Sequence, residues 1–304
     1  MEAGVSRAGR VRLPIVSARA FCALAYFALA ALVLIVVTGA TVRLTSSGLG
    51  CENWPRCGET FLPEKGYHAY IEFGNRVVGV LVGLSTLVGA LAAWRVPALP
   101  RRLAWGAVAL PLLVLSQGIL GGITVIFELH PLIVMAHFLL SLVAVALAVA
   151  VAIGAHEFAL GGAAAPADVR ARLGWLALAL LPPTLALVVT GTLVTAASPH
   201  SGGDEIARFG NLVDAVHVHV GAAAAFGVGF LAVVAVLLAE RARARVELAV
   251  AAVILALLLA QVAVGEIQWR EQLPWGLVLV HVALATAVWT GMVALAVRLF
   301  PRRT

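Results

Sequence analysis

The sequence predicts an all-α membrane protein whose eight transmembrane helices form two pseudo-symmetric four-helix bundles. Three observations lead to this class: the composition, the length of the apolar runs and an internal repeat. Of the 304 residues, 62% are hydrophobic and 12% are charged, whereas a soluble domain has roughly 45–50% apolar and about 25% charged residues. This composition excludes a soluble enzyme, a disordered protein and a nucleic-acid-binding protein, although the net charge is +6.

The apolar runs are continuous, which indicates helices rather than the alternating strands of a membrane β-barrel. A helical span needs about 20 mainly apolar residues, and eight segments reach that length. We expect the spans at residues 20–42, 69–93, 103–127, 131–154, 173–196, 212–238, 247–268 and 275–298.

The basic residues indicate the orientation of these spans. Of the 21 Lys and Arg residues, 15 fall on one side of the predicted membrane, and short basic segments stay in the cytoplasm. We therefore expect a multi-pass protein of the bacterial plasma membrane with both termini in the cytoplasm. The 15 residues are Arg7, Arg10, Arg12, Arg19, Arg95, Arg101, Arg102, Arg170, Arg172, Arg241, Arg243, Arg245, Arg298, Arg302 and Arg303.

The chain repeats itself once, at an interval of four spans. The offsets of three matches are 144, 142 and 152 residues. Because four spans are an even number, the two halves enter the membrane in the same sense, and an axis along the membrane normal relates them. The matches are QGILGGITVIFELHPLIVMAH at 117–137 with QVAVGEIQWREQLPWGLVLVH at 261–281, EFGNRVVG at 72–79 with DAVHVHVG at 214–221, and TGATV at 38–42 with TGTLV at 190–194.

The repeat and the spans divide the chain into two bundles and their flanking segments. We expect a cytoplasmic segment at 1–19, an N-terminal bundle at 20–155 with a structured outer loop at 43–68, a cytoplasmic linker at 156–172, a C-terminal bundle at 173–299 and a cytoplasmic tail at 300–304.

The outer loop contains two cysteines, Cys51 and Cys57. It lies on the oxidising side of the membrane, where disulfides form, and the sequence favours a structural bridge between the two. The alternatives are two free thiols or a redox pair used in catalysis.

Among the histidines inside predicted spans, three lie at a similar depth: His137, His217 and His281. All are about 8–9 Å from the outer end of their helix, at a rise of about 1.5 Å per residue. Polar groups in the bilayer are costly and often functional, although a single one can be a packing residue with a satisfied hydrogen bond. We expect His217 and His281 to face each other as axial ligands of one haem iron. His219 lies about 200° further around the helix and should point away.

Glu72 lies near the outer end of the second span and shares a helix face with Asn75, while Arg76 is its neighbour at the i+4 position. Two interpretations stand beside each other. Glu72 and Arg76 form an ion pair at the membrane interface, or Glu72 gives and takes a proton beside a ligand pocket.

Several motifs resemble those of the haem A synthase family: TGATVRLTSSGLGCENWPRC, IEFGNR, QGILGGITV and VMAHFLL. The resemblance extends over nearly the whole chain. Members convert haem O to haem A for terminal oxidases, oxidising one methyl substituent of the porphyrin to a formyl group. The resemblance implies haem b in the C-terminal half with His217 and His281 as its ligands, haem O as substrate beside His137, and Glu72 as the essential acid.

Asn75 departs from the family pattern, since many members carry histidine there and asparagine is a poor ligand for haem iron. Either His137 alone binds the substrate haem, which leaves one face open, or the second histidine is dispensable.

The expected partners are membrane lipid, haem O and an electron donor that the sequence does not identify, and we expect no nucleic acid. Association with haem O synthase, with terminal oxidase assembly proteins or with further copies of the chain is compatible with the resemblance. Two alternative functions are a haem-b electron-transfer protein without oxygenase activity and, more remotely, a transporter.

Overall fold

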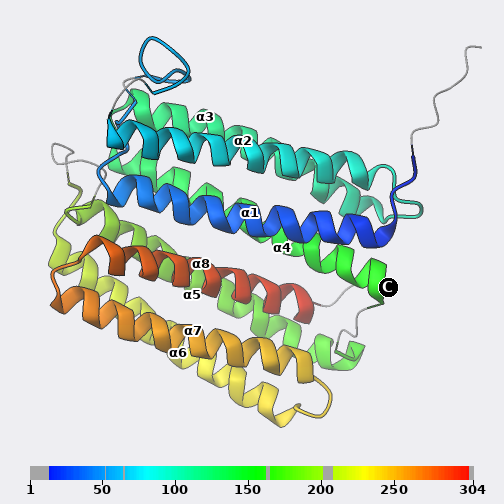
Figure 1. Cartoon of the computed structure of the whole chain (residues 1–304). Coiled ribbons are helices and arrows are strands. Elements are labelled where there is room, and N and C mark those ends of the chain that lie inside the picture. Colours follow the sequence, from blue (N-terminus) through cyan, green and yellow to red (C-terminus); the bar gives the residue numbers. More distant parts are fainter. Residues whose placement is uncertain (1–13, 52, 64–65, 162–164, 201–207, 301–304) are drawn as a thin grey trace, which may run out of the picture.

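The computed structural model describes residues 14–51, 53–63, 66–161, 165–200 and 208–300, and the expected terminal segments at 1–13 and 301–304 lie outside them. Eight α-helices fill these ranges (Figure 1). They are α1 (Ala18–Leu44), α2 (Tyr67–Ala93), α3 (Arg101–Ile126), α4 (Pro131–Leu160), α5 (Ala167–Ala197), α6 (Leu212–Ala239), α7 (Arg245–Arg270) and α8 (Trp275–Leu299).

Each of these helices is long and apolar enough to cross a membrane, so the eight expected spans are confirmed as helices. Most boundaries agree with the expected ones to within two residues. The exceptions are α4 and α5, which continue into the expected linker at 156–172. Gly161 ends α4 in the left-handed conformation, with φ 65°, which glycine adopts without steric cost.

The helices form two groups of neighbours. In the first, α1 contacts α2 and α4, and α3 contacts the same two helices; in the second, α5 contacts α6 and α8, and α7 contacts the same two. Each group has its own cluster of buried apolar side chains. The groups meet where α8 packs on α1 and α4, and Trp289 Nε1 donates a hydrogen bond to the Leu142 carbonyl across this contact at 2.9 Å.

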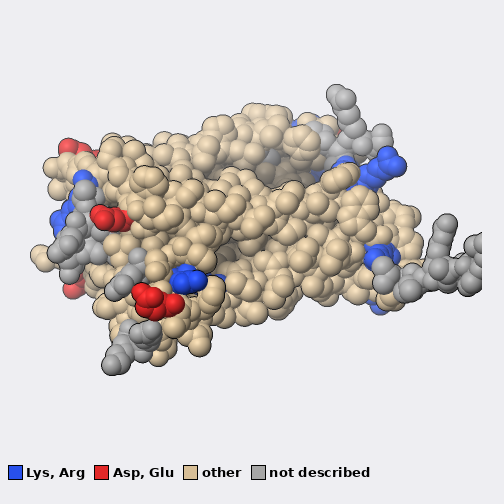
Figure 2. Space-filling view, turned by 90° about the horizontal axis from the view of Figure 1, so that it is seen from above, with Lys and Arg blue, Asp and Glu red and all other residues tan. Residues whose placement is uncertain are grey.

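The connections between successive helices alternate between the two ends of the bundle (Figure 1). We call the end that carries the described residues 45–51, 53–63, 66, 127–130, 198–200, 208–211 and 271–274 the loop end. Charged side chains on the visible face gather toward the two ends, and the surface between them is almost entirely uncharged (Figure 2). This distribution is what a protein with an apolar belt in lipid requires.

One ion pair is buried at the end opposite the loop end. Arg298 of α8 donates to Glu247 Oε1 of α7 from Nε at 3.0 Å and from Nη2 at 2.8 Å. Glu247 is 1% exposed. Removing one partner of a buried pair leaves the other charge without compensation.

Glu247→Ala should therefore lower the free energy of unfolding by about 3–5 kcal/mol. Its matched control is Glu266→Ala, which removes the exposed pair between Glu266 and Arg270 on the same helix and should cost about 0–1 kcal/mol. Thermal unfolding in detergent measures both. Equal losses in the two variants would contradict a stabilising role for the buried pair.

Candidate functional site

The segment between α1 and α2 is closed by a disulfide. Cys51 and Cys57 are bonded to each other, and they are 1% and 5% exposed. The expected bridge is therefore confirmed, and two free thiols are excluded. The remaining cysteine, Cys22, is free and buried in α1.

The Glu72 carboxylate holds this segment against α2. Glu72 is 5% exposed; its Oε1 pairs with Arg76 Nη2 at 2.5 Å and its Oε2 accepts the backbone N–H of Cys51 at 2.8 Å. The expected ion pair is thus present, and both carboxylate oxygens are engaged. Arg76 also donates to the carbonyls of Asn53 (3.2 Å), Pro55 (3.3 Å) and Arg56 (2.8 Å).

The same segment packs on α3 through Trp54. A Cβ at Gly122 would lie 2.7 Å from Trp54 Cδ2, closer than two carbon atoms can approach, so only glycine permits this contact. Gly122 follows Gly121, which contacts His137. The disulfide segment therefore covers the part of the first group of helices where His137 lies.

His137 of α4 lies against α3 in a specific arrangement. Gln117 Nε2 donates to the His137 carbonyl at 3.2 Å, and one turn further along α3 a Cβ at Gly121 would lie 3.4 Å from His137 Cε1. The imidazole is half-buried, and its Nδ1 is buried without a hydrogen-bond partner among the described residues. An unpaired buried nitrogen is costly, so packing alone does not account for this position.

The second half repeats this arrangement. Gln261 Nε2 of α7 donates to the His281 carbonyl of α8 at 3.1 Å, and a Cβ at Gly265 would lie 3.2 Å from His281 Cε1. His281 Nδ1 is again buried and unpaired within the described part of the chain. The repeated sequence thus produces a repeated geometry of glutamine, glycine and histidine.

The histidine that faces His281 is His219, and the expectation that His219 points away is wrong. The ring centroids of His219 and His281 are 6.4 Å apart, with an angle of 70° between the ring planes. His219 Nδ1 lies 3.1 Å from Thr190 Oγ1 of α5, and a Cβ at Gly191 would lie 3.2 Å from its Cε1. Packing against α5 sets the rotation of α6.

His217, by contrast, is exposed on the surface of the chain. Two residues separate it from His219, so the two side chains leave the helix in nearly opposite directions. Gly221, which the sequence suggested as space for a macrocycle beside His217, is exposed as well. Sequence reasoning missed His219 because it matched the second span to the sixth at an offset of 142.

Asn75 occupies the corresponding place in the first half. Thr38 Oγ1 of α1 donates to Asn75 Oδ1 of α2 at 2.8 Å, as Thr190 of α5 contacts His219 of α6. The step from Asn75 to His219 is 144 residues, which equals the step from His137 to His281. This common offset could have revealed His219 from the sequence.

The other described histidines have roles in loops and at helix ends. His68 Nδ1 lies 2.9 Å from Ser47 Oγ, His200 Nε2 lies 2.7 Å from the Leu273 carbonyl, and His156 Nδ1 lies 3.4 Å from the Tyr26 hydroxyl. His130 precedes the first residue of α4 as its N-cap.

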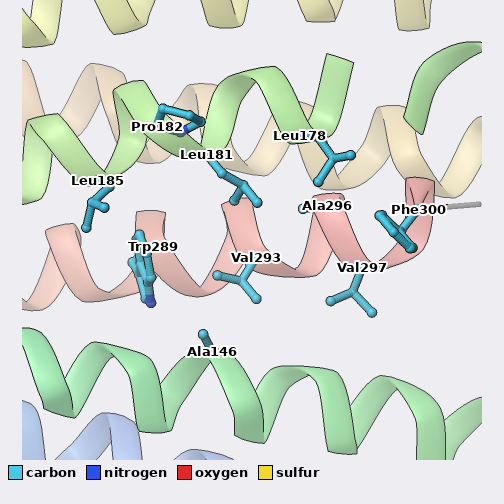
Figure 3. Close-up of a pocket in the computed structure, with 10 residues that line it drawn as sticks. All are labelled: Ala146, Leu178, Leu181, Pro182, Leu185, Trp289, Val293, Ala296, Val297 and Phe300. Atoms are coloured by element: carbon cyan, nitrogen blue, oxygen red, sulfur yellow. The ribbon is translucent and has the colours of Figure 1, made fainter. Parts of the chain in front are cut away.

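A groove of about 570 Å³ lies between α5 and α8, with Ala146 of α4 on a third side (Figure 3). Leu181 and Leu185 of α5 point toward α8, which carries Trp289 and Val293. None of its ten lining residues carries a titratable side chain. The groove therefore offers apolar contact, and the candidate chemistry lies with the histidines nearer the loop end.

Comparison with known proteins decides the family. The model of the COX15-CtaA family, described as cytochrome oxidase assembly protein, matches residues 23–67 and 61–293. The match extends from α1 to α8. The chain belongs to this family. The resemblance noted in the sequence is thereby confirmed.

Similar proteins named heme A synthase occur in several bacteria. The protein of Symbiobacterium thermophilum is 38% identical over 136 residues, which cover 42% of this family member and 43% of the relative. The protein of Lysinibacillus sphaericus is 30% identical over 176 residues, which cover 56% and 57%. The protein of Halalkalibacterium halodurans is 32% identical over 117 residues, which cover 38% and 39%. The family member thus matches between two fifths and somewhat over half of each relative's length.

The second group of helices can hold one metal ion between two imidazoles. An imidazole nitrogen binds a first-row metal at about 2.0–2.1 Å, and the 6.4 Å between the ring centroids of His219 and His281 leaves room for that. Because Thr190 engages Nδ1 of His219, Nε2 is the ring nitrogen that remains for a metal. His219 and His281 would therefore suit as the two protein ligands of a haem iron.

The first prediction from this site concerns Arg76. Arg76→Leu removes the donors that hold the disulfide segment, and a hydrogen bond to a charged group is worth about 1.5–3 kcal/mol. We expect the Cys51–Cys57 bond to be reduced roughly tenfold faster or more by a water-soluble phosphine. Thiol labelling after timed reduction measures the rate.

Arg56→Leu is the matched control, because Arg76 binds the backbone carbonyl of Arg56 and not its side chain. The control should be reduced at the wild-type rate. Identical rates in Arg76→Leu and wild type would show that the clamp does not protect the disulfide.

Proposed function

We propose that the chain is a haem A synthase, a membrane oxidoreductase that oxidises a methyl substituent of haem O to the formyl group of haem A. The observation that carries the proposal is the family match along both groups of helices. The relatives named heme A synthase and the repeated histidine arrangement support it.

The two groups of helices serve, in this proposal, as pseudo-symmetric bundles with different tasks. Residues 20–155 receive the substrate haem and residues 173–299 hold haem b. The support is the repeated contact of Gln117 with His137 and of Gln261 with His281. The loop end lies outside the plasma membrane and both termini lie in the cytoplasm, as the distribution of basic residues favours.

The C-terminal bundle binds haem b through His219 and His281. The 6.4 Å between their rings supports this pair, and the exposed position of His217 argues for His219 in its place. Haem b supplies one-electron chemistry when bound. Gly191 and Gly265 leave room for the two rings, and Thr190 fixes the orientation of His219.

The N-terminal bundle binds haem O through His137 and orients it toward Glu72. Glu72 lies three residues from Asn75, about one helical turn toward the loop end. Arg76 and the Cys51 amide hold the carboxylate in one position. We assign to Glu72 the exchange of a proton at the substrate haem. Arg76 positions Glu72 and the disulfide segment.

The test is haem analysis of cells that express the chain together with a source of haem O. Wild type should form haem A. Glu72→Gln keeps an oxygen that can accept the Cys51 N–H but cannot carry the proton, so haem A formation should fall roughly 10²–10⁴-fold while haem b is retained. Glu59→Gln, an exposed residue of the same segment, should behave as wild type.

Full haem A formation by Glu72→Gln would contradict the proton-exchange role. Haem b without any haem A in wild type would contradict the synthase proposal and point to an electron-transfer protein.

A further inference from the structure

We propose that the N-terminal site leaves one axial face of its substrate haem open on the side of Asn75, where a diatomic ligand can bind, whereas the C-terminal site closes both faces. The proposal rests on the proposed function, since it concerns the same substrate site. It assigns Asn75 and Thr38 to the side of the site that stays open.

Asn75 and His219 occupy equivalent positions in the two groups of helices. Each lies on the second helix of its group, and each is bound by a threonine of the first helix, at 2.8 Å from Thr38 and 3.1 Å from Thr190. Asn75 lies 62 residues before His137, and His219 lies 62 residues before His281. The offset of 144 residues between the two halves is therefore the same for both positions.

Asn75 and His219 each lie across their group of helices from the histidine of the fourth helix. In each group the second and fourth helices are the diagonal pair, since the contacts run around the ring through the first and third. His219 and His281 nevertheless bring their rings to 6.4 Å across the second group. The repeat places Asn75 and His137 on the same diagonal of the first group.

The two sites differ in the side chains that they offer to a haem iron. The axial side chains that proteins give to haem iron are His, Cys, Met and Tyr, and an asparagine amide is not among them. Where the C-terminal site offers two imidazoles, the N-terminal site offers one imidazole and one amide. His137 therefore binds one face of the iron, and the face toward Asn75 has no protein ligand at that position.

The open face is polar because the Asn75 amide lies on that side. Asn75 Oδ1 accepts from Thr38, so the amide nitrogen carries the donors that can reach a bound ligand. Hydrogen-bond donors in the distal pocket decide how a haem treats a diatomic ligand. His68, two turns earlier on α2 and about 10 Å away along the helix, is engaged by Ser47.

The experiment measures carbon monoxide binding to the reduced protein loaded with both haem b and haem O. Wild type should bind one carbon monoxide for every two haems. Asn75→His should lose that binding, because a second imidazole closes the face. Asn75→Ala should keep it, because no ligand is removed. An unchanged low-spin spectrum of haem b reports that the two Asn75 variants are folded.

The reciprocal variant is His219→Asn, which gives the C-terminal site the residues of the N-terminal one. It should bind carbon monoxide at both haems. The proposal is overturned if wild type binds none, or if Asn75→His binds as wild type does. Haem A formation by wild type is measured separately. Normal haem A formation without carbon monoxide binding overturns only the open axial face. Carbon monoxide binding without haem A formation overturns only the proposed synthase activity.

Discussion

The close approach of an imidazole to a glycine is the constraint on which the rest of the structure depends. At Gly121 and Gly265 a Cβ would lie 3.4 and 3.2 Å from the ring of the histidine on the next helix. An alanine at Gly121 would be in van der Waals contact with the ring, an alanine at Gly265 would require a shift of the ring, and a larger side chain at either position would move the ring or separate the helices. With glycine there, the glutamine one turn away reaches the backbone carbonyl of the same histidine. Helix packing and the aim of the imidazole are therefore fixed by one set of contacts in each half.

The disulfide segment extends this constraint to the surface. Trp54 lies on Gly122, the neighbour of Gly121, and Arg76 and Glu72 bind the backbone of the same segment. The ion pair between Glu72 and Arg76 lies within α2, and such a pair is stronger near an apolar surface than in water. Glu72 thus lies on the helix that carries Asn75 and binds the backbone of the disulfide segment. The hydrogen bonds of Glu72 with Arg76 and with the Cys51 amide fix the position of its carboxylate. The proposed proton exchange uses the carboxylate in that position.

The sequence predicted what depends on composition and on local spacing. The eight spans, the disulfide, the Glu72–Arg76 pair and the glutamine–glycine–histidine repeat all depend on length, charge or residues one turn apart. The choice between His217 and His219 was not of this kind. It depends on the rotation of α6 about its own axis, which packing of His219 against Thr190 and Gly191 sets. The extensions of α4 and α5 were missed because helices continue beyond the apolar run that defines a span.

The claim at the centre of this account is that His219 and His281 hold haem b. The most direct measurement is the optical and electron paramagnetic resonance spectrum of the purified protein and of two single variants. Wild type should show a low-spin haem with two axial histidines. His219→Ala should lose this signal, and His217→Ala should keep it because that side chain is exposed. Loss of the signal in His217→Ala together with its retention in His219→Ala would contradict the account.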